Sequence, residues 1–240
     1  MYAVDLHTHT RFFHGRRSLG DRFDPIGVRL LAWAAKRRGL AGLATTNHDY
    51  YTAFEPPGPV TTLPGIEITT DRGHVLVVGS DPPAATKPGA LSPREAVALA
   101  HERDCAAIVA HPFRNSTVRE LEDVPFDAIE VNGKHPRSRS LVEELADSRN
   151  LPLVGGSDAH YPFEVGRAYT VVDADRLTPE SVVEAIRDGR VSARVSRSPL
   201  DRLLRRGYRT IHRRKRVIDA IERPTPGIGV PPGEDDPKKN

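Results

Sequence analysis

Seven of the ten histidines, one glutamate and one aspartate fall in short clusters at or beside apolar runs of the chain. Apolar runs of this length are typical of β-strands, so the clusters mark predicted strand ends. Neutral imidazole and carboxylate groups are the ligands that proteins offer to catalytic Zn²⁺, Mn²⁺ and Fe²⁺. The candidate ligands are His7, His9, His14, His48, Glu67, His74, His111, Asp158 and His160.

Two pairs of these residues have a spacing that suits chelation from one strand end. His7 and His9 are two residues apart, as are Asp158 and His160, and side chains at i and i+2 of a strand point the same way. One such pair is weak evidence, so the prediction depends on the recurrence of ligands at successive strand ends. Catalytic residues of parallel barrels gather at that edge. We therefore predict a polynuclear metal site at the mouth of a barrel.

Apolar β-rich runs alternate with helical patterns, which favours an α/β protein with a parallel sheet, open or closed. The predicted strands cover residues 2–6, 40–45, 66–69, 74–78, 106–110, 128–131, 151–154 and 168–172. The predicted helices cover residues 25–38, 92–104, 137–149 and 178–188. Asp24 and Pro25 predict where the first helix begins, and Gly39 predicts its end. Ser92 and Glu95 have the spacing of a capping box, which predicts the start of the second.

Length and composition indicate one well-packed domain of 240 residues. Cys105 is the single cysteine, so it cannot form an internal disulfide, and we expect a buried structural thiol. The chain shows neither a signal-peptide pattern nor an apolar run of membrane-spanning length, so we expect a cytoplasmic protein.

The positive charge of the chain is local. Between Arg197 and Arg216 nine Arg or Lys and one Asp give a charge of +8, so the rest of the chain sums to −5 against a total of +3. We predict a barrel domain over residues 1–196, a basic amphipathic helical tail over 197–223 and a disordered C-terminus over 224–240, which is rich in Pro, Gly and charge.

The tail allows three interpretations. Its apolar residues approximate a helical stripe, and they are Leu200, Leu203, Leu204, Ile211, Ile218 and Ile221. The stripe favours docking on the negative barrel, the arginines suit the phosphates of nucleic acid, and the two together suit an anionic membrane surface.

Over roughly residues 2–175 the order of motifs resembles the polymerase and histidinol phosphatase (PHP) family. The motifs are DLHTHT, TNHD, GIEIT with a following GH, AHPF and GSDAH, in the order and with spacing similar to those of the family. The resemblance implies a distorted (β/α)7 barrel with two or three divalent ions (Mn, Zn or Fe) at the C-terminal ends of its strands.

The resemblance also implies a ligand set for each ion. The ligands of a first ion match His7, His9, Glu67 and Asp158. The ligands of a second match Glu67, which would bridge the two ions, His74 and His111. The ligands of a third match His14, His48 and His160. The residues implied in catalysis are His7, His9, Glu67, Asp158 and His160. All nine positions hold a competent ligand, which argues against a metal-free member.

Three residues beside the ligands are predicted to orient them. Asp5 lies two residues before His7 and Asp49 directly follows His48, so each carboxylate is placed to hold an imidazole; capping of a strand or loop end is the other interpretation. Asn47 stands where the family usually has Asp in a T-D-H sequence. An asparagine can still accept a hydrogen bond but carries no charge.

Two or three neighbouring cations suit phosphoryl chemistry, and we predict a metal-dependent phosphoesterase in which a metal-bound hydroxide attacks phosphorus in line. The phosphate would need cationic or N–H partners. The candidates, each of which has a solvated surface position as its alternative, are Arg16, Arg17, Arg114, Lys134, His135 and Arg167.

The substrate that the resemblance favours is a nucleotide or the 5′ end of a short nucleic acid, with 5′-to-3′ exonuclease or nucleotide phosphatase activity. Only 47 residues separate His111 from Asp158 and 19 separate His48 from Glu67, which leaves no room for a sizeable cap over the mouth. The alternatives are a small-metabolite phosphatase of the histidinol-phosphate type, an amide hydrolase, and a non-catalytic metal-binding module of a nucleic-acid complex.

Overall fold

The computed structural model describes residues 1–10, 17–51, 53, 60–114, 116–134, 138–196, 198 and 201, with the side chains of 17–25 left out. Three candidate site residues, His14, Arg16 and His135, lie outside the described residues, as does the side chain of Arg17. The predicted C-terminus and all of the predicted tail except residues 198 and 201 also lie outside them.

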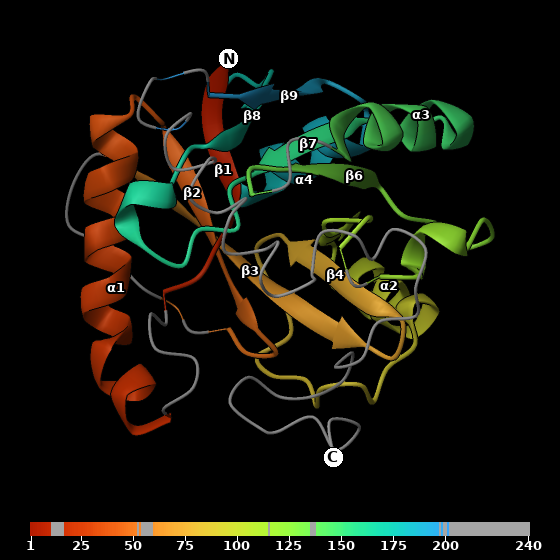
Figure 1. The fold of residues 1–240 in the computed structure, drawn as a ribbon, viewed down its shortest axis with the longest axis horizontal. Coiled ribbons are helices and arrows are strands. Elements are labelled where there is room, and N and C mark those ends of the chain that lie inside the picture. Colours follow the sequence, from red (N-terminus) through yellow and green to blue (C-terminus); the bar gives the residue numbers. More distant parts are fainter. Residues whose placement is uncertain are drawn as a thin grey trace.

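The described residues form nine strands, four α-helices and two short 3-10 helices (Figure 1). The strands are β1 (Tyr2–Thr8), β2 (Gly42–His48), β3 (Thr61–Thr70), β4 (Gly73–Val78), β5 (Ala106–Val109), β6 (Ala128–Asn132), β7 (Leu153–Gly156), β8 (Ala168–Val172) and β9 (Val191–Val195). The helices are α1 (Arg17–Arg37), α2 (Pro93–His101), α3 (Arg139–Arg149), α4 (Pro179–Arg187), η1 (Val118–Glu120) and η3 (Pro162–Glu164).

The nine described strands form one mixed sheet in the order β7-β6-β5-β4-β3-β2-β1-β8-β9. The sheet is nearly closed on itself. Gly155 N of β7 donates to Thr170 Oγ1 of β8 over 2.8 Å, and this hydroxyl donates back to Gly155 O over 3.0 Å. At the mouth, Thr8 and Ala159 form a parallel bridge. The fold is therefore a distorted α/β barrel, as the sequence predicted.

The prediction of a parallel sheet was wrong for β4 and β8. β4 runs antiparallel to both β3 and β5, and β8 runs antiparallel to β1 and β9. Only residues 71 and 72 connect β3 to β4, whereas a parallel pairing needs a crossover of about a dozen residues or more. Because β4 is inverted, its first residues lie at the C-terminal ends of β3 and β5. His74, near the start of β4, therefore reaches the same mouth as the other ligands.

The sequence patterns predicted some element boundaries correctly and others wrongly. The capping box of α2 forms as predicted, with Ser92 N donating to Glu95 Oε2 over 2.8 Å and Glu95 N donating to Ser92 Oγ over 3.3 Å. The predicted start of α1 was wrong, because the helix begins at Arg17 and runs through Pro25. A proline removes one backbone bond from a helix without always ending it. Strand β9 was missed, since it is short and half-polar and pairs with β8 alone.

Two features adjust the end of β1, which carries His7 and His9. Between the pairs Asp5–Leu43 and Thr8–Thr45, β1 has one residue more than β2, which marks a β-bulge. A bulge changes the direction of the following side chains, so the alternation expected for a regular strand is interrupted between Asp5 and Thr8. Helix α1 then approaches the strand end closely. A Cβ on Gly27 would lie 1.9 Å from the carbonyl oxygen of Thr10, so glycine is needed there.

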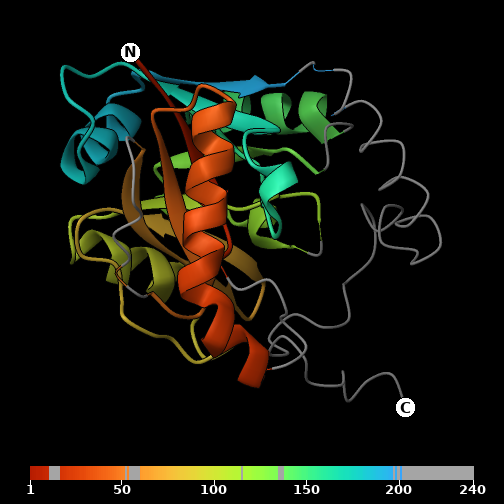
Figure 2. The same cartoon turned by 90° about the vertical axis from the view of Figure 1, so that its left-hand side faces the viewer.

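The core consists of apolar residues on both faces of the barrel wall. Leu6, Leu76 and Ile108 lie in one buried cluster with residues of α4, and Ile66 and Val109 lie in another with residues of α2 and α3. Helix α1 runs along the outside against β2, as Figure 2 shows. Cys105 is buried and free, as predicted. Within the described part of the chain, no helix is both long and apolar enough to cross a bilayer.

Candidate metal centre

Glu67 on β3 is the centre of the site. It is fully buried, and it pairs with His48 on the neighbouring strand β2. Both of its oxygens face imidazole nitrogens. The atoms near Oε1 are His74 Nδ1 at 2.7 Å and His111 Nε2 at 3.0 Å. The atoms near Oε2 are His48 Nδ1 at 3.0 Å, His7 Nε2 at 3.2 Å and His9 Nε2 at 3.3 Å. One carboxylate thus joins five histidines that come from four segments of the chain.

Asp158, just after β7, is the second buried carboxylate. Its Oδ1 lies 3.3 Å from His160 Nδ1 and 3.5 Å from His9 Nε2. Two cations also reach it, since Arg114 donates to Oδ2 over 2.8 Å and the Lys134 ammonium donates to Oδ1 over 3.2 Å. Asp158 therefore stands between the histidine cluster and the positively charged side of the mouth.

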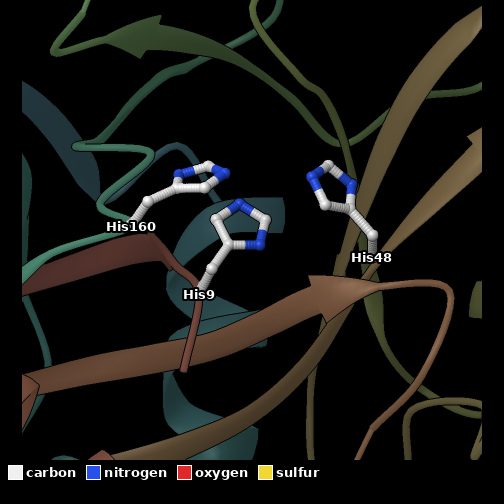
Figure 3. A group of neighbouring side chains, drawn as sticks. All are labelled: His9, His48 and His160. Carbon is white, nitrogen blue, oxygen red and sulfur yellow. The ribbon is translucent and has the colours of Figure 1, made fainter. Parts of the chain in front are cut away.

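The ligand atoms gather in three overlapping groups, in each of which they lie within 4.8 Å of one another. Among the described residues, the groups are His7, His9 and Asp158; His48, Glu67 and His74; and His9, His48 and His160. Figure 3 shows the third group, in which the rings of the three histidines are turned toward one another. The ring centroids of His9 and His160 are 4.3 Å apart. Eight of the nine candidate ligands are brought together here, and the ninth, His14, lies outside the described residues.

The chemistry of these groups fits divalent cations. His7 Nε2 and His9 Nε2 approach to 3.1 Å, a distance that suits two lone pairs sharing a cation as well as it suits a hydrogen bond. Three imidazole nitrogens lie within 3.3 Å of Glu67 Oε2, but no group in the described part of the chain has the geometry of a hydrogen bond to this buried oxygen. The buried His111 Nδ1 also has no hydrogen-bond partner among the described residues. Buried polar atoms normally have partners, and a cation bound by Glu67 would provide one for Oε2.

The electrostatics hold Glu67, Asp158, His9 and His111 in the protonation states that metal ligands need. His7 is the exception, because Glu130 and Glu67 outweigh its burial and raise its pKa well above the usual value. Burial favours the neutral acids, but the neighbouring histidines outweigh it and hold the pKa of Glu67 well below its usual range. Lys134 and the histidines do the same for the pKa of Asp158. Burial lowers the pKa of His9 and of His111, which keeps both imidazoles neutral. Carboxylate and neutral imidazole are the metal-binding forms.

Backbone strain accompanies the site. Three residues that follow strand ends at the mouth have positive φ angles without being glycine: Asp49 at 58°, His111 at 27° and Asp158 at 53°. Such conformations are uncommon for side-chain-bearing residues and cluster at functional sites, where the surrounding structure stabilises them. Two of the three are candidate ligands, so the strain sets the direction of their side chains.

Glu130 is a site residue that the sequence did not reveal. It is fully buried on β6. Its Oε1 lies 2.8 Å from His7 Nδ1, its Oε2 accepts from the backbone N–H of His111 over 2.7 Å, and Asn132 Nδ2 donates to both oxygens. A Cβ on Gly156 would lie 2.4 Å from Oε1, so the glycine makes room for this carboxylate. The one signal was a charged residue inside an apolar strand, which predicts only that it has a partner.

The three residues predicted to orient ligands all bind backbone near the strand ends. Asp5 accepts from the N–H groups of His7 (3.3 Å), Ser157 (2.9 Å) and Gly166 (2.7 Å), and burial raises its pKa to about 6. Its carboxylate therefore joins the ends of β1 and β7 to the start of β8. Asp49 Oδ1 accepts from Thr69 N and from Thr86 Oγ1, both over 2.9 Å.

Asn47 makes two complementary bonds to Thr10, just after β1. Its Oδ1 accepts from Thr10 N over 2.8 Å, and its Nδ2 donates to Thr10 Oγ1 over 2.8 Å. An aspartate can form the same pair, because the threonine hydroxyl can rotate and donate instead. The departure from the family pattern therefore preserves the contact.

We expect Asn47→Asp to keep this contact and Asn47→Ala to lose it. In the alanine variant the buried N–H of Thr10 loses its acceptor, which costs about 1–3 kcal/mol of unfolding free energy. Urea denaturation of the two variants and the wild type measures the difference. Equal losses in both variants would show that the Thr10 contact is not what position 47 contributes.

The other candidate substrate contacts have different surroundings. Arg114 and Lys134 reach Asp158, and Lys134 Nζ also lies 2.8 Å from His160 Nδ1. Arg167 is fully buried rather than solvated, with NH1 4.0 Å from Glu164 Oε1. The other oxygen of Glu164 accepts from His160 N over 2.7 Å. Arg167 thus lies behind the loop that carries His160.

Comparison with known proteins gives one family match and several solved structures. The family described as PHP-associated matches residues 136–191. No curated protein matches the chain. PsfC from Pseudomonas syringae PB-5123 superposes with a TM-score of 0.67 at 20% identity, covering 88% of this chain and 98% of that one.

Two further structures extend beyond the region they share with this chain. A two-domain protein from Bacteroides vulgatus ATCC 8482, which contains a predicted PHP-like metal-dependent phosphoesterase, has a TM-score of 0.56 at 20% identity, covering 81% of this chain and 64% of that one. The lesion-specific endonuclease PfuEndoQ from Pyrococcus furiosus has a TM-score of 0.52 at 18% identity, covering 80% of this chain and 57% of that one. At these identities the likeness shows a shared fold.

Proposed function

We propose that this chain is a PHP-domain protein and a metal-dependent phosphoesterase, a hydrolase of phosphate esters. The match of the PHP-associated family to residues 136–191 and the shared fold support the proposal. The observation that carries the proposal is the cluster around Glu67 and Asp158, in which two ionised, buried carboxylates face six imidazoles. Two or three divalent ions are expected there, of Mn, Zn or Fe. Such ions would act as Lewis acids toward phosphoryl oxygens and would acidify water.

Glu67 and Asp158 would hold the ions with the histidines, and Arg114 and Lys134 would bind the substrate. Both cations now neutralise Asp158, at 2.8 and 3.2 Å. An ion bound to Asp158 would compete for that carboxylate and leave the guanidinium and the ammonium to a phosphate. Arginine binds phosphate with two parallel N–H bonds and lysine binds it as a point charge, so the pair suits an anionic ester.

For the substrate we propose a nucleotide or the 5′ end of a short nucleic acid. The connections that follow β2 and β5 cover residues 49–60 and 110–127, which leaves no room for a sizeable cap and supports a mouth that admits an end of a nucleic-acid chain. The structural likeness to an endonuclease supports the same class. A small phosphorylated metabolite is the alternative, and the following experiment separates the two.

The test supplies Mn²⁺-loaded protein with a short 5′-phosphorylated oligonucleotide and identifies the products, with Asp158→Asn as the matched inactive variant. Mononucleotides released stepwise would support a 5′-to-3′ exonuclease. Free phosphate with an intact oligonucleotide would support a phosphomonoesterase.

If no product forms, the nucleic-acid substrate is wrong, and a panel of small phosphate esters then tests the metabolite alternative. Wild-type activity in Asp158→Asn would contradict the assignment of the site itself.

A further inference from the structure

Helix α1 presents an apolar stripe to solvent. Ile26, Leu30 and Trp33 are 47%, 41% and 58% exposed, and their spacing of four and three residues places them on one side of the helix. The opposite side, with Leu31 and Ala35, is fully buried against the barrel. Figure 2 shows α1 along the outside of the molecule. A contiguous group of large exposed apolar residues on a helix marks a contact surface more often than single residues do.

From Ile26 to the end of the helix, every charged residue beside the stripe is cationic. Arg29, Lys36 and Arg37 are exposed on the same helix, and the chain has no acidic residue from 26 to 38. Within the described part of the chain none of the three forms an ion pair, and the Arg37 guanidinium lies over the Trp33 ring at 4.9 Å. A partner for this surface therefore needs both apolar and negatively charged groups.

The last described residue of the chain, Asp201, lies beside the end of this helix. Asp201 is fully buried, and its two oxygens accept from the Arg38 guanidinium over 2.9 and 3.0 Å. The chain thus leaves the described structure at the C-terminal end of α1. From residue 202 to 216 the sequence holds eight more Arg or Lys, among apolar residues at helical spacing.

We propose that this surface of α1, the α1 stripe with its three cations, docks on an anionic lipid bilayer. The charge of the sequence that follows Asp201 favours the same kind of partner. Trp and Leu beside Lys and Arg are the composition of helices that lie in the membrane interface. A bilayer can accept the apolar stripe and the cations beside it together, and each cation near its surface adds to binding.

Other occupants fit the surface less well. A second copy packed stripe against stripe, or the basic segment itself, would bring cations against Arg29, Lys36 and Arg37. Nucleic acid would satisfy the charge but would leave the Ile26 and Leu30 side chains against phosphates. The proposal is independent of the reaction proposed above.

Trp33 is the only tryptophan, so its fluorescence reports on this surface directly. We expect the full chain to show a saturable blue shift with vesicles of phosphatidylcholine and phosphatidylserine at 3:1. The shift should be much weaker with phosphatidylcholine alone and should decline as salt is added, because salt screens the attraction. Arg29→Gln and Lys36→Gln should each weaken partition about fivefold. Leu30→Ser should weaken it while leaving the reporter in place.

The matched control is Arg139→Gln, which removes an exposed arginine from α3 and should leave partition unchanged. No shift with the anionic vesicles would overturn the proposal. A shift of the same size with a single-stranded oligonucleotide would assign the surface to nucleic acid instead. In lipid-free protein, protection of Trp33 from iodide at all concentrations would show that the chain itself covers the stripe. Protection of Trp33 from iodide that appears only at high protein concentration would show that a second copy of the chain covers the stripe.

Discussion

Replacing Glu67 by glutamine is expected to remove metal binding and phosphoesterase activity together while the barrel stays folded. Glutamine has the shape of glutamate but offers one oxygen in place of two and carries no charge. In the structure Oε1 faces two imidazoles and Oε2 faces three, so either orientation of the amide places an NH₂ group against nitrogens that should face a cation. The single oxygen of glutamine therefore cannot bind metal ions on both sides of the residue at once.

The size of this effect should exceed the roughly 10- to 100-fold loss that follows removal of a residue that only orients a ligand. Metal content per chain by elemental analysis, calorimetric titration with Mn²⁺ and near-ultraviolet circular dichroism measure binding and fold separately. Glu143→Gln, on the exposed face of α3, is the matched control. Wild-type metal content in Glu67→Gln would refute a bridging role for this residue.

Replacing Glu130 by glutamine is expected to lower metal affinity about 10- to 100-fold although Glu130 is not itself a candidate ligand. The carboxylate accepts from the backbone N–H of His111 and lies 2.8 Å from His7 Nδ1, so it favours the tautomer with the proton on Nδ1. That tautomer leaves the lone pair on Nε2, which faces Glu67 and His9. The orientation of His7 thus depends on a residue 123 positions away in sequence.

Glutamine cannot accept at both ends of its side chain. If its oxygen stays with the N–H of His111, its NH₂ group faces His7 Nδ1 and favours the tautomer with the proton on Nε2, which cannot bind a metal there. If the amide turns round, the buried N–H of His111 is left without an acceptor, which costs about 1–3 kcal/mol.

Calorimetric titration with Mn²⁺ over a range of pH measures the loss, with the same Glu143→Gln variant as control. A destabilised protein with unchanged metal affinity would show that Glu130 supports the fold alone. The expected result is instead a weaker affinity whose pH dependence differs from that of the wild type.

Features with a local cause were predictable from the sequence. The capping box at Ser92 and the strand from Ala168 to Val172 depend on residues close together in the chain, and the structure has both as predicted. The candidate ligands were visible because histidine and carboxylate are chemically distinctive and recur at strand ends. Their types and order in the chain were sufficient to indicate a polynuclear centre.

Other features of the site depend on contacts between distant segments, and these the tertiary structure decided. The inversion of β4 brings His74 to the mouth from the start of a strand, and the bulge in β1 shifts the register of its end against β2. Glu130 appeared in the sequence only as a charge inside an apolar run. It lies in the site because β6 pairs with both β5 and β7. His111 follows β5 and Asp158 follows β7, so both residues lie near the end of β6.

Residue types and local spacing therefore determined which side chains could serve as ligands, because that chemistry belongs to each residue. The tertiary structure decided which oxygen faces which nitrogen, because distances of about 3 Å between strands depend on sheet order, register and strained turns. Asp158 illustrates both. Its spacing to His160 is local, but its positive φ angle and its bonds to Arg114 and Lys134 exist only in the closed barrel.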